Sequence, residues 1–189
     1  MRSSIRLKHP RASYWHRPSA IIANKPEPAV ASWLRDQGSL TRRLVNRCGN
    51  DFSVRLLSEQ WVRPRIDEAR LLRIPPHQRV LLRQVQLRCE LQVLVYARSV
   101  IPLKTLEGRH RRLKHLGNKP LGGALFANPR LKRELQQLAT ILPRDPMFDI
   151  ALSHNQGHFE RIWGRRSLFR IDNKPLLVSE YFLPGLTQA

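Results

Sequence analysis

Two strand-like runs joined by a very short connection constrain the fold more than any other feature of the sequence. Residues 78–90 and 93–102 are rich in Val, Leu and Ile, a composition typical of β-strands. Only Leu91 and Gln92 lie between the two apolar runs, so together they predict a hairpin. The sequence therefore favours a domain built on an antiparallel sheet.

Further elements are predicted on both sides of this hairpin. Helices are expected over residues 29–36, 40–47, 103–116 and 121–138, with Ser39 as the cap of the second. Strands are expected over residues 51–62, 167–171 and 176–183, and the last two would form a closing hairpin. Residues 142–160 contain two prolines and a glycine and predict a partly helical loop. Such a mixture indicates the α+β class.

The length of 189 residues suits one domain. We expect this domain to span residues 28–189, because two prolines at positions 26 and 28 end a basic segment without acidic residues. Residues 1–27 would then form a basic, flexible N-terminal arm. The composition of this arm also suits an organellar transit peptide.

Cysteine and hydropathy patterns exclude several classes of protein. Cys48 and Cys89 lie far apart without a C-x-x-C pair, so we expect no disulfide framework, no cysteine zinc site and a reducing, cytoplasmic location. His154 and His158 are four residues apart, but Gly157 interrupts them and no third metal ligand is evident. No apolar run approaches the roughly 20 residues of a membrane-spanning helix. We therefore expect neither a metal site nor a membrane span.

The net charge of +20 indicates an anionic partner, and charge alone does not choose among nucleic acid, anionic lipid and a small acid. Nucleic acid is one candidate, because residues 109–115 form a basic run on a predicted helix. However, no helix-turn-helix, zinc-finger or aromatic RNA-binding motif accompanies this run, and a charge run is usually a solvated helix face. Nucleic-acid binding is therefore the less favoured interpretation.

Two charged residues lie on the apolar faces of predicted strands. Alternate side chains of a strand share a face. Arg83 shares its face only with uncharged residues: Leu81, Val85, Leu87 and Cys89. Glu180 likewise shares its face only with apolar residues: Leu176, Val178 and Phe182. Because a buried charge needs a partner, each of the two must be paired or must line a cavity.

Two interpretations of these charges remain open. Arg83 and Glu180 would either neutralise each other inside the domain or line a pocket for an anion. In such a pocket, Arg83 would bind a carboxylate through two hydrogen bonds, a task for which its planar group is better suited than lysine. Glu180 would accept a hydrogen bond from a hydroxyl group of the same ligand.

Two predicted helix starts would add donors to this pocket, because the first amides of a helix have no internal partner. Leu40 follows the Ser39 cap, and Leu121 precedes two glycines that allow another group to approach the backbone closely. Each leucine would give an amide and an apolar wall to a ligand. Alternatively, each merely begins an amphipathic helix.

Six stretches of the chain form a pattern in their order and spacing. They are Asp36-Gln37-Gly38-Ser39-Leu40-Thr41, the strand around Arg83, Ala97-Arg98-Ser99-Val100-Ile101-Pro102, Lys119-Pro120-Leu121-Gly122, Trp163-Gly164-Arg165-Arg166-Ser167, and Lys174-Pro175-Leu176-Leu177 through Glu180 to Phe182-Leu183-Pro184. This pattern resembles the chorismate pyruvate-lyases that make 4-hydroxybenzoate for ubiquinone. The resemblance covers residues 28–185.

The resemblance implies an α+β fold with a single antiparallel sheet of about six strands and helices enclosing a buried ligand cavity. It implies a lyase that eliminates pyruvate from chorismate, the first committed step of ubiquinone biosynthesis, without metal or cofactor. Arg83 and Glu180 would be the catalytic residues. The ring carboxylate would be bound by Arg83 and the amides of Leu40 and Leu121, and Glu180 would meet the ring hydroxyl.

The chemistry of this substrate adds three expectations. Arg98, and Arg165 or Arg166, are weaker candidates for binding the second carboxylate, since each also reads as a solvated strand end. Glu180 would orient the hydroxyl rather than remove the ring hydrogen. The product keeps the groups that Arg83 and Glu180 bind, so strong product inhibition is expected. We expect the protein to be a monomer. The alternative to a lyase is a non-catalytic small-acid-binding module of the same fold.

Overall fold

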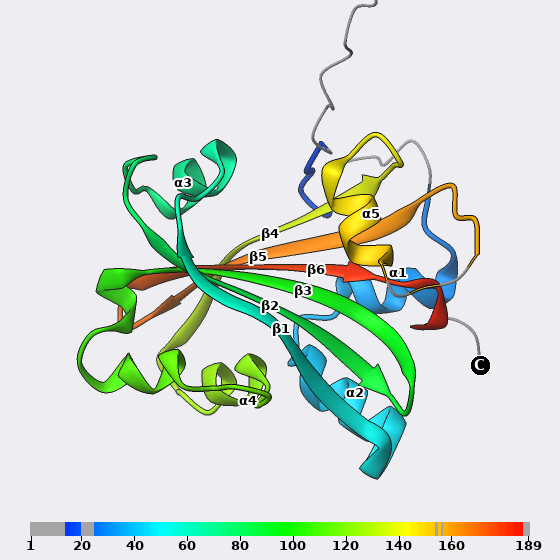
Figure 1. The fold of residues 1–189 in the computed structure, drawn as a ribbon, viewed down its shortest axis with the longest axis horizontal. Helices are drawn as coiled ribbons and strands as arrows, with labels where there is room; N and C mark the ends of the chain where they lie inside the picture. The colour runs from blue at the N-terminus through cyan, green and yellow to red at the C-terminus, as the bar shows by residue number, and fades with distance from the viewer. Residues whose placement is uncertain (1–13, 20–24, 154, 156, 187–189) are drawn as a thin grey trace, which may run out of the picture.

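Six strands form one antiparallel sheet in the computed structural model (Figure 1). The structure describes residues 14–19, 25–153, 155 and 157–186. The strands are β1 (Phe52–Val62), β2 (Val80–Cys89), β3 (Gln92–Pro102), β4 (Leu131–Ile141), β5 (Ile162–Ile171) and β6 (Lys174–Phe182). Their order across the sheet is β1-β2-β3-β6-β5-β4. The predicted α+β class with a single antiparallel sheet of about six strands is confirmed.

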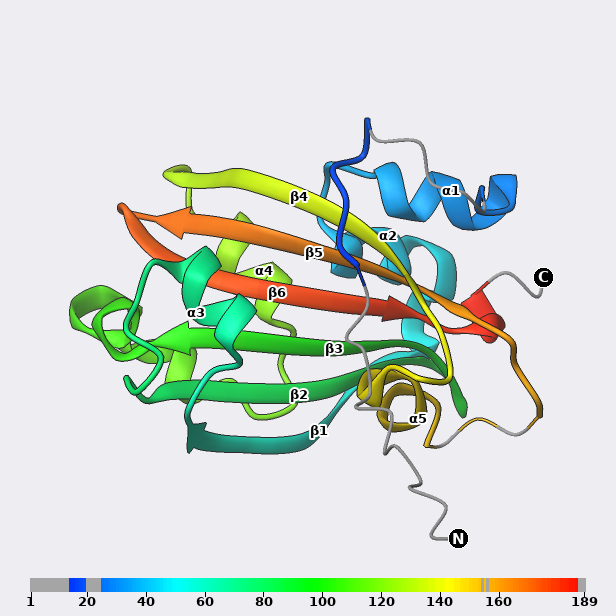
Figure 2. The same ribbon diagram turned by 90° about the horizontal axis from the view of Figure 1, so that it is seen from above.

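Helices cover both faces of this sheet. On one face lie α1 (Pro28–Arg35), α2 (Leu40–Cys48) and α4 (Leu121–Phe126), and on the other lie α3 (Ile66–Leu72) and α5 (Pro146–Leu152) (Figures 1 and 2). Short 3₁₀ helices complete the chain: η1 (Gly49–Asp51), η2 (Leu103–Leu106), η3 (Gly108–Lys114) and η4 (Pro184–Leu186). The hydrophobic core therefore has two layers, one on each side of the sheet.

The hydrophobic layer under α1 and α2 lies at one end of the face that carries the pocket described below. Leu34 of α1 and Leu44 of α2 are fully buried there against the sheet. Burying a leucine side chain contributes about 1.5–3 kcal/mol. Farther along the same face, Leu125 of α4 packs with Leu81 and Leu176. The starts of α2 and α4 are thereby held above the sheet.

The predicted helix over residues 121–138 is wrong beyond its first turns. Helix α4 ends at Phe126, and the chain continues as the edge strand β4, paired with β5 from Leu131 opposite Ile171 to Ile141 opposite Ile162. Pro129 cannot continue a helix. Most of the residues that follow it favour helix, but pairing with the free edge of β5 outweighs that preference.

Other predicted elements differ in detail. The hairpin of β2 and β3 is confirmed, with its turn at Glu90 and Leu91. Residues 103–116 form the 3₁₀ helices η2 and η3 in place of one α-helix, and β5 begins five residues earlier than predicted, at Ile162. Helix α3 was not predicted, whereas α5 lies within the segment predicted as a partly helical loop.

The expectation that the cysteines form no disulfide framework is wrong for Cys48 and Cys89. A disulfide joins Cys48, the last residue of α2, to Cys89, the last residue of β2, and their Cα atoms are 5.6 Å apart. The pairing of Phe52 opposite Cys89 at the start of β1 brings the end of α2 beside the end of β2. Sequence separation did not reveal this approach, because it depends on strand pairing.

Part of the predicted N-terminal arm lies against the domain. His16 pairs with Leu138 of β4 through two backbone hydrogen bonds of 2.8 and 2.7 Å. The ring of Trp15 packs edge-on against Tyr181, with 6.4 Å between centroids. Residues 1–13 and 20–24 of this segment lie outside the described residues. Within the described parts of the chain, every helix is too short or too polar to cross a bilayer.

Candidate functional site

A pocket lies between the sheet and the starts of α2 and α4. Its empty volume is about 540 Å³, which includes open solvent at its mouth. The four predicted site residues, Arg83, Glu180, Leu40 and Leu121, all line it. Residues from β2 and β6 thus lie beside residues from the starts of α2 and α4. The alternation of side chains on the strands and the two glycines after Leu121 predicted this arrangement. Full enclosure of this pocket by helices stays a prediction.

Arg83 is a buried cation whose hydrogen-bonding capacity is only partly used. Its side chain is 1% exposed. Its Nη2 donates to the carbonyl oxygens of Gly117 and Lys119 at 2.8 Å each, which ties the segment before α4 to the sheet. Its Nε lies 3.7 Å from Oε2 of Glu59 on β1 and has no hydrogen-bond partner among the described residues. Burial lowers the pKa of Arg83, and Glu59 opposes that shift.

Glu180 is held by a different cation. Its Oε2 accepts a hydrogen bond of 2.6 Å from Nε of Arg165 on the adjacent strand β5. Arg165 is 1% exposed, and its Nη1 also donates to the carbonyl oxygens of Trp33 and Asp36 at 2.8 and 2.9 Å. Among the residues that the structure describes, Oε1 of Glu180 accepts no hydrogen bond. Arg83 and Glu180 therefore do not neutralise each other directly, and Oε1 can still accept a hydrogen bond.

The two helix starts meet through a glycine. Ser39 caps α2, and its Oγ accepts a hydrogen bond of 3.3 Å from the Arg42 amide, as predicted. A Cβ atom built on Gly122 would lie 2.7 Å from Oγ1 of Thr41. A side chain at residue 122 would therefore require Thr41 to rotate or the starts of α2 and α4 to move apart. Within the described residues, the amides of Leu40 and Leu121 have no hydrogen-bond acceptor.

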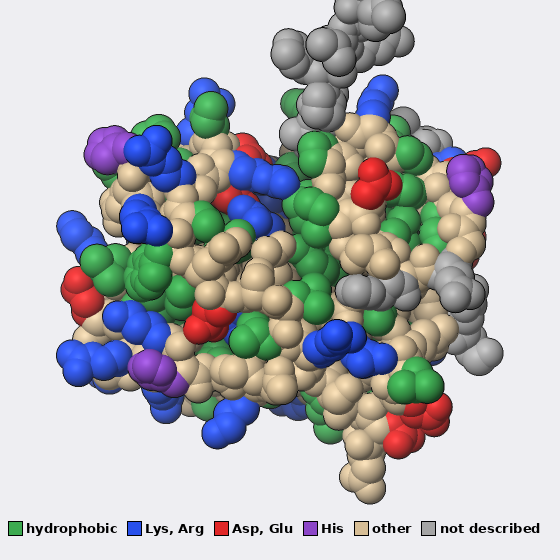
Figure 3. All heavy atoms as spheres, viewed as in Figure 1, with side chains coloured by type: hydrophobic (Ala, Val, Ile, Leu, Met, Phe, Trp, Pro, Cys, Tyr) green, Lys and Arg blue, Asp and Glu red, His purple; other side chains and the backbone are tan. Residues whose placement is uncertain are grey.

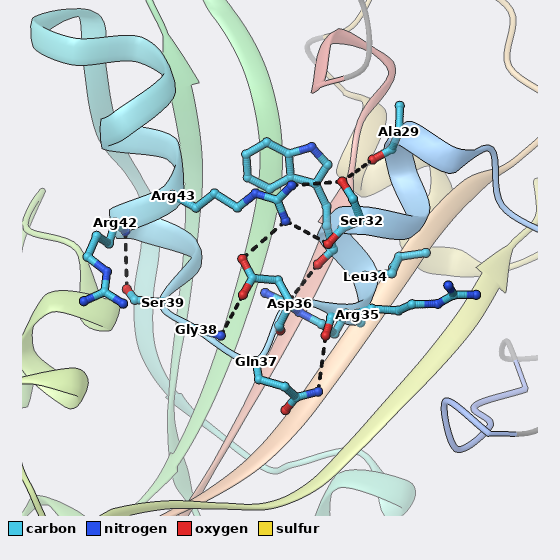
Figure 4. Close-up of polar contacts among 12 residues, drawn as sticks. Ala29, Ser32, Leu34, Arg35, Asp36, Gln37, Gly38, Ser39, Arg42 and Arg43 are labelled. Atoms are coloured by element: carbon cyan, nitrogen blue, oxygen red, sulfur yellow. Dashed lines mark hydrogen bonds and ion pairs between the residues drawn. The ribbon is translucent and has the colours of Figure 1, made fainter.

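The connection between α1 and α2 is stiffened by Asp36 (Figure 4). Its Oδ1 accepts a hydrogen bond of 2.7 Å from the Gly38 amide, and its Oδ2 pairs with Nη1 of Arg43 at 3.3 Å. Arg43 also lies over the ring of Trp33, 3.8 Å from its centroid. Although burial opposes the shift, the Gly38 amide and Arg43 lower the pKa of Asp36. These contacts position the chain that leads into Leu40.

Arg133 lines the same pocket and was not predicted. It projects from β4 and donates hydrogen bonds only to neutral oxygens: the carbonyl oxygens of Asp36 and Gly38 and the side-chain oxygens of Gln37 and Gln136. Its Nε is buried without a partner among the described residues. Burial lowers the pKa of Arg133, and Arg165 lowers it further, against the opposite effects of Glu180 and Asp36. Because residues 121–138 were predicted to be helical, the sequence did not show that Arg133 faces the pocket from a strand.

The other arginines considered for a second carboxylate are neither solvated strand ends nor free. Arg98 lies on the opposite face of the sheet and pairs with Glu68 of α3 at 2.8 Å. Arg166 also lies on that face and pairs with Asp67 of α3 at 2.6 Å. Arg165 is on the pocket side but is engaged by Glu180. None of the three is available for a ligand in the pocket.

The basic run is partly engaged within the protein, and the considered histidine pair is only partly described. Lys and Arg side chains gather at the end of the molecule that carries α3 and η3 (Figure 3). Within η3, however, His110 is buried and lies 2.8 Å from Asp172. His154 of the considered histidine pair lies outside the described residues. Among the residues described, no three His, Cys, Asp or Glu side chains are close enough to bind a metal ion.

Sequence comparison identifies one family. The sequence model of the chorismate lyase family matches residues 9–188. A relative from Methylococcus capsulatus, named "probable chorismate pyruvate-lyase", is 46% identical over 83% of this chain and 96% of its own length. Relatives with the same name from Methylobacillus flagellatus and Nitrosomonas europaea are 40% and 36% identical, over 82% and 87% of this chain and 86% and 95% of their own lengths.

Solved structures with a similar fold come from transcriptional regulators. The effector domain of PhnF from Mycobacterium smegmatis matches with a TM-score of 0.56 and 15% identity, over 78% of this chain and 90% of that one. A GntR-family regulator from Bacillus cereus matches with a TM-score of 0.54 and 11% identity, over 72% of this chain and 94% of that one. At such identities the likeness concerns the fold alone.

Proposed function

This chain belongs to the chorismate lyase family, and we propose that it eliminates pyruvate from chorismate in the pocket between the sheet and the starts of α2 and α4. The single observation that carries the assignment to this pocket is the convergence there of four residues from separate elements: Arg83, Glu180, Leu40 and Leu121. In this family the reaction yields 4-hydroxybenzoate as the first committed step of ubiquinone biosynthesis.

Arg83 binds the ring carboxylate in this proposal. A carboxylate would supply the charge and the acceptors that this buried guanidinium lacks, because Glu59 approaches Nε only to 3.7 Å. The amides of Leu40 and Leu121 add two donors at the same end. The two carbonyl acceptors of Arg83, on Gly117 and Lys119, fix its orientation before the ligand arrives.

Glu180 orients the ring hydroxyl in this proposal. The hydroxyl donates to Oε1, while Arg165 occupies Oε2. Arg165 thereby fixes the orientation of the carboxylate, which suits a hydrogen-bond acceptor that positions the hydroxyl. Much of the driving force comes from the substrate, whose ring becomes aromatic when it loses enolpyruvate and one hydrogen. The protein supplies a fixed conformer and a charged environment.

The decisive experiment measures pyruvate release from chorismate by coupling it to lactate dehydrogenase. Wild-type protein should release one pyruvate per 4-hydroxybenzoate formed. Arg83→Ala removes a hydrogen bond to a charged group and should lower kcat/KM by about 10- to 150-fold. Glu180→Gln should lower kcat/KM, although its amide oxygen still accepts a hydrogen bond. Full activity in both variants would show that the active site lies elsewhere. An inactive wild-type chain would refute the proposed function.

Product inhibition follows from the same contacts. 4-Hydroxybenzoate keeps the carboxylate and the hydroxyl, so Arg83 and Glu180 would bind it as they bind chorismate. Release of the product should then limit turnover. Progress curves should flatten early and slow further when 4-hydroxybenzoate is added at the start. Curves unchanged by added product would contradict these roles for the two residues.

The proposal also includes a monomeric, cytoplasmic enzyme that does not act on nucleic acid. One chain contributes both the floor and the helix starts of the pocket, which supports activity as a monomer. Size-exclusion chromatography with light scattering, cell fractionation and a salt-dependent gel shift would test these three points.

A further inference from the structure

Arg133 is the pocket cation whose charge is least compensated. Arg165 pairs with Glu180 at 2.6 Å, and Arg83 has Glu59 at 3.7 Å. Within the described residues, no carboxylate lies within ion-pair distance of Arg133. Its Nη1 and Nη2 donate only to carbonyl and amide oxygens, and its Nε has no partner. A half-buried guanidinium in this condition favours an anion beside it.

The sheet places this cation at a definite end of the pocket. Glu180 lies on β6, two strands from β2, which carries Arg83, and two strands from β4, which carries Arg133. Neighbouring strands are about 4.8 Å apart, so each arginine backbone lies roughly 10 Å across the sheet from that of Glu180. Phe169 lies beneath Arg133, whose guanidinium carbon is 5.0 Å from the ring centroid. The register places Arg83 level with Val178 and Arg133 level with Leu176, so the two cations lie on opposite sides of the strand that carries Glu180.

The substrate has a second carboxylate at the matching end. In chorismate the ring hydroxyl is opposite the ring carboxylate, and the enolpyruvyl ether is on the carbon next to the hydroxyl. When Arg83 binds the ring carboxylate and Glu180 the hydroxyl, the enolpyruvyl carboxylate lies at the Glu180 end of the pocket. Resting on the proposed function, we propose that Arg133 binds this enolpyruvyl carboxylate and is the residue by which the pocket distinguishes substrate from product.

This contact would also assist the reaction. The bond between the ring carbon and the ether oxygen breaks, and its electron pair goes to the enolpyruvyl oxygen. The ring hydrogen leaves as a proton, its electron pair completes the aromatic ring, and protonation of the enolate gives pyruvate. A fixed positive charge beside the departing group stabilises the enolate as it forms. The contact ends when pyruvate leaves, because 4-hydroxybenzoate has no second carboxylate.

Kinetics and product binding of Arg133→Gln test this role. Glutamine retains a donor for the 36–38 turn but removes the charge. We expect kcat/KM for chorismate to fall by about 10- to 100-fold, because a charged hydrogen bond is lost. The Kd for 4-hydroxybenzoate, measured by calorimetry, should change by less than about threefold. Arg133→Lys should retain more activity than Arg133→Gln, since it keeps the charge.

Arg130→Gln is the matched control. Arg130 is 67% exposed and pairs with Asp172 away from the pocket, so its removal lowers the net charge without touching the site. Activity of Arg133→Gln equal to that of Arg130→Gln would overturn the proposal. Parallel loss of chorismate turnover and product affinity would also overturn it, because Arg133 would then only position the 36–38 turn. If the wild-type chain releases no pyruvate, the proposed function itself fails, and this proposal fails with it.

Discussion

Replacing Gly122 with alanine tests whether the close approach of α2 and α4 builds the pocket. The added Cβ would lie 2.7 Å from Oγ1 of Thr41 and 3.4 Å from Oγ of Ser39. Real Cβ contacts do not reach 2.7 Å, so either Thr41 must rotate or the helix starts must separate. Thr41 is β-branched and lies in the first turn of α2, which limits its rotation.

The expected cost follows from overpacking. Extra methyl groups in a packed site typically cost about 1–3 kcal/mol. If the whole cost falls on the arrangement that binds ligand, 4-hydroxybenzoate should bind about 5- to 150-fold more weakly to Gly122→Ala. Calorimetry would measure the Kd, and circular dichroism would follow the melting temperature in the same samples. Chorismate turnover should fall with product affinity, because both ligands would bind the same amides under the proposed function.

Gly123→Ala is the matched control for this substitution. A Cβ atom at residue 123 would meet only Cγ of Pro120, at 3.9 Å, and alanine is favoured over glycine within a helix. This variant should therefore bind product like the wild type. Adding Thr41→Ala to Gly122→Ala removes the clashing oxygen and should restore part of the affinity. Unchanged product affinity in Gly122→Ala would refute the idea that these helix starts must touch.

Two further predictions concern stability. Asp36 has a lowered pKa in the folded state. Its charge therefore stabilises the fold above the unfolded-state pKa near 4, and this effect is lost as the pH falls through the lower folded-state pKa. In urea unfolding, Asp36→Asn should be less stable than the wild type at pH 7, and the difference should shrink below about pH 4. The disulfide between Cys48 and Cys89 closes a segment with a sequence separation of 41, for which the loop-entropy relation gives about 4 kcal/mol. A reducing agent should therefore lower the free energy of unfolding of the wild type by up to that amount. Unfolding of Cys48→Ser should be insensitive to the agent. Equal stability of the wild type with and without the reducing agent would contradict a stabilising disulfide.

The predictable part of the site came from strand alternation. On β2 and β6, side-chain direction depends only on position along the strand. Arg83 and Glu180 could therefore be assigned to inward faces before any pairing was known, and both line the pocket. Their charged neighbours, Glu59 and Arg165, were not predictable in this way, because they lie on strands whose register depends on the whole sheet.

Strand β4 shows where local patterns fail. Its sequence consists largely of residues that favour helix, and only Pro129 signalled that α4 had ended. Even a correct strand assignment would not have fixed the face of Arg133, because the register shifts between Arg133 and Leu135. Such an irregularity changes which side chains share a face. The contact between Cys48 and Cys89 was not predictable for the same reason, because it depends on how β1 pairs with β2.

The charges around the pocket bear on how a lyase of this kind can accelerate its reaction. Arg83 and Glu180 would contact groups that substrate and product share, so these contacts strengthen binding without favouring the transition state. Acceleration then requires a contact with the group that departs. Arg165 is engaged by Glu180, and Arg98 and Arg166 lie across the sheet in ion pairs with α3. A cation that binds only the enolpyruvyl group would speed the chemical step without tightening the binding of the product. The separate strands of this sheet allow that division of roles.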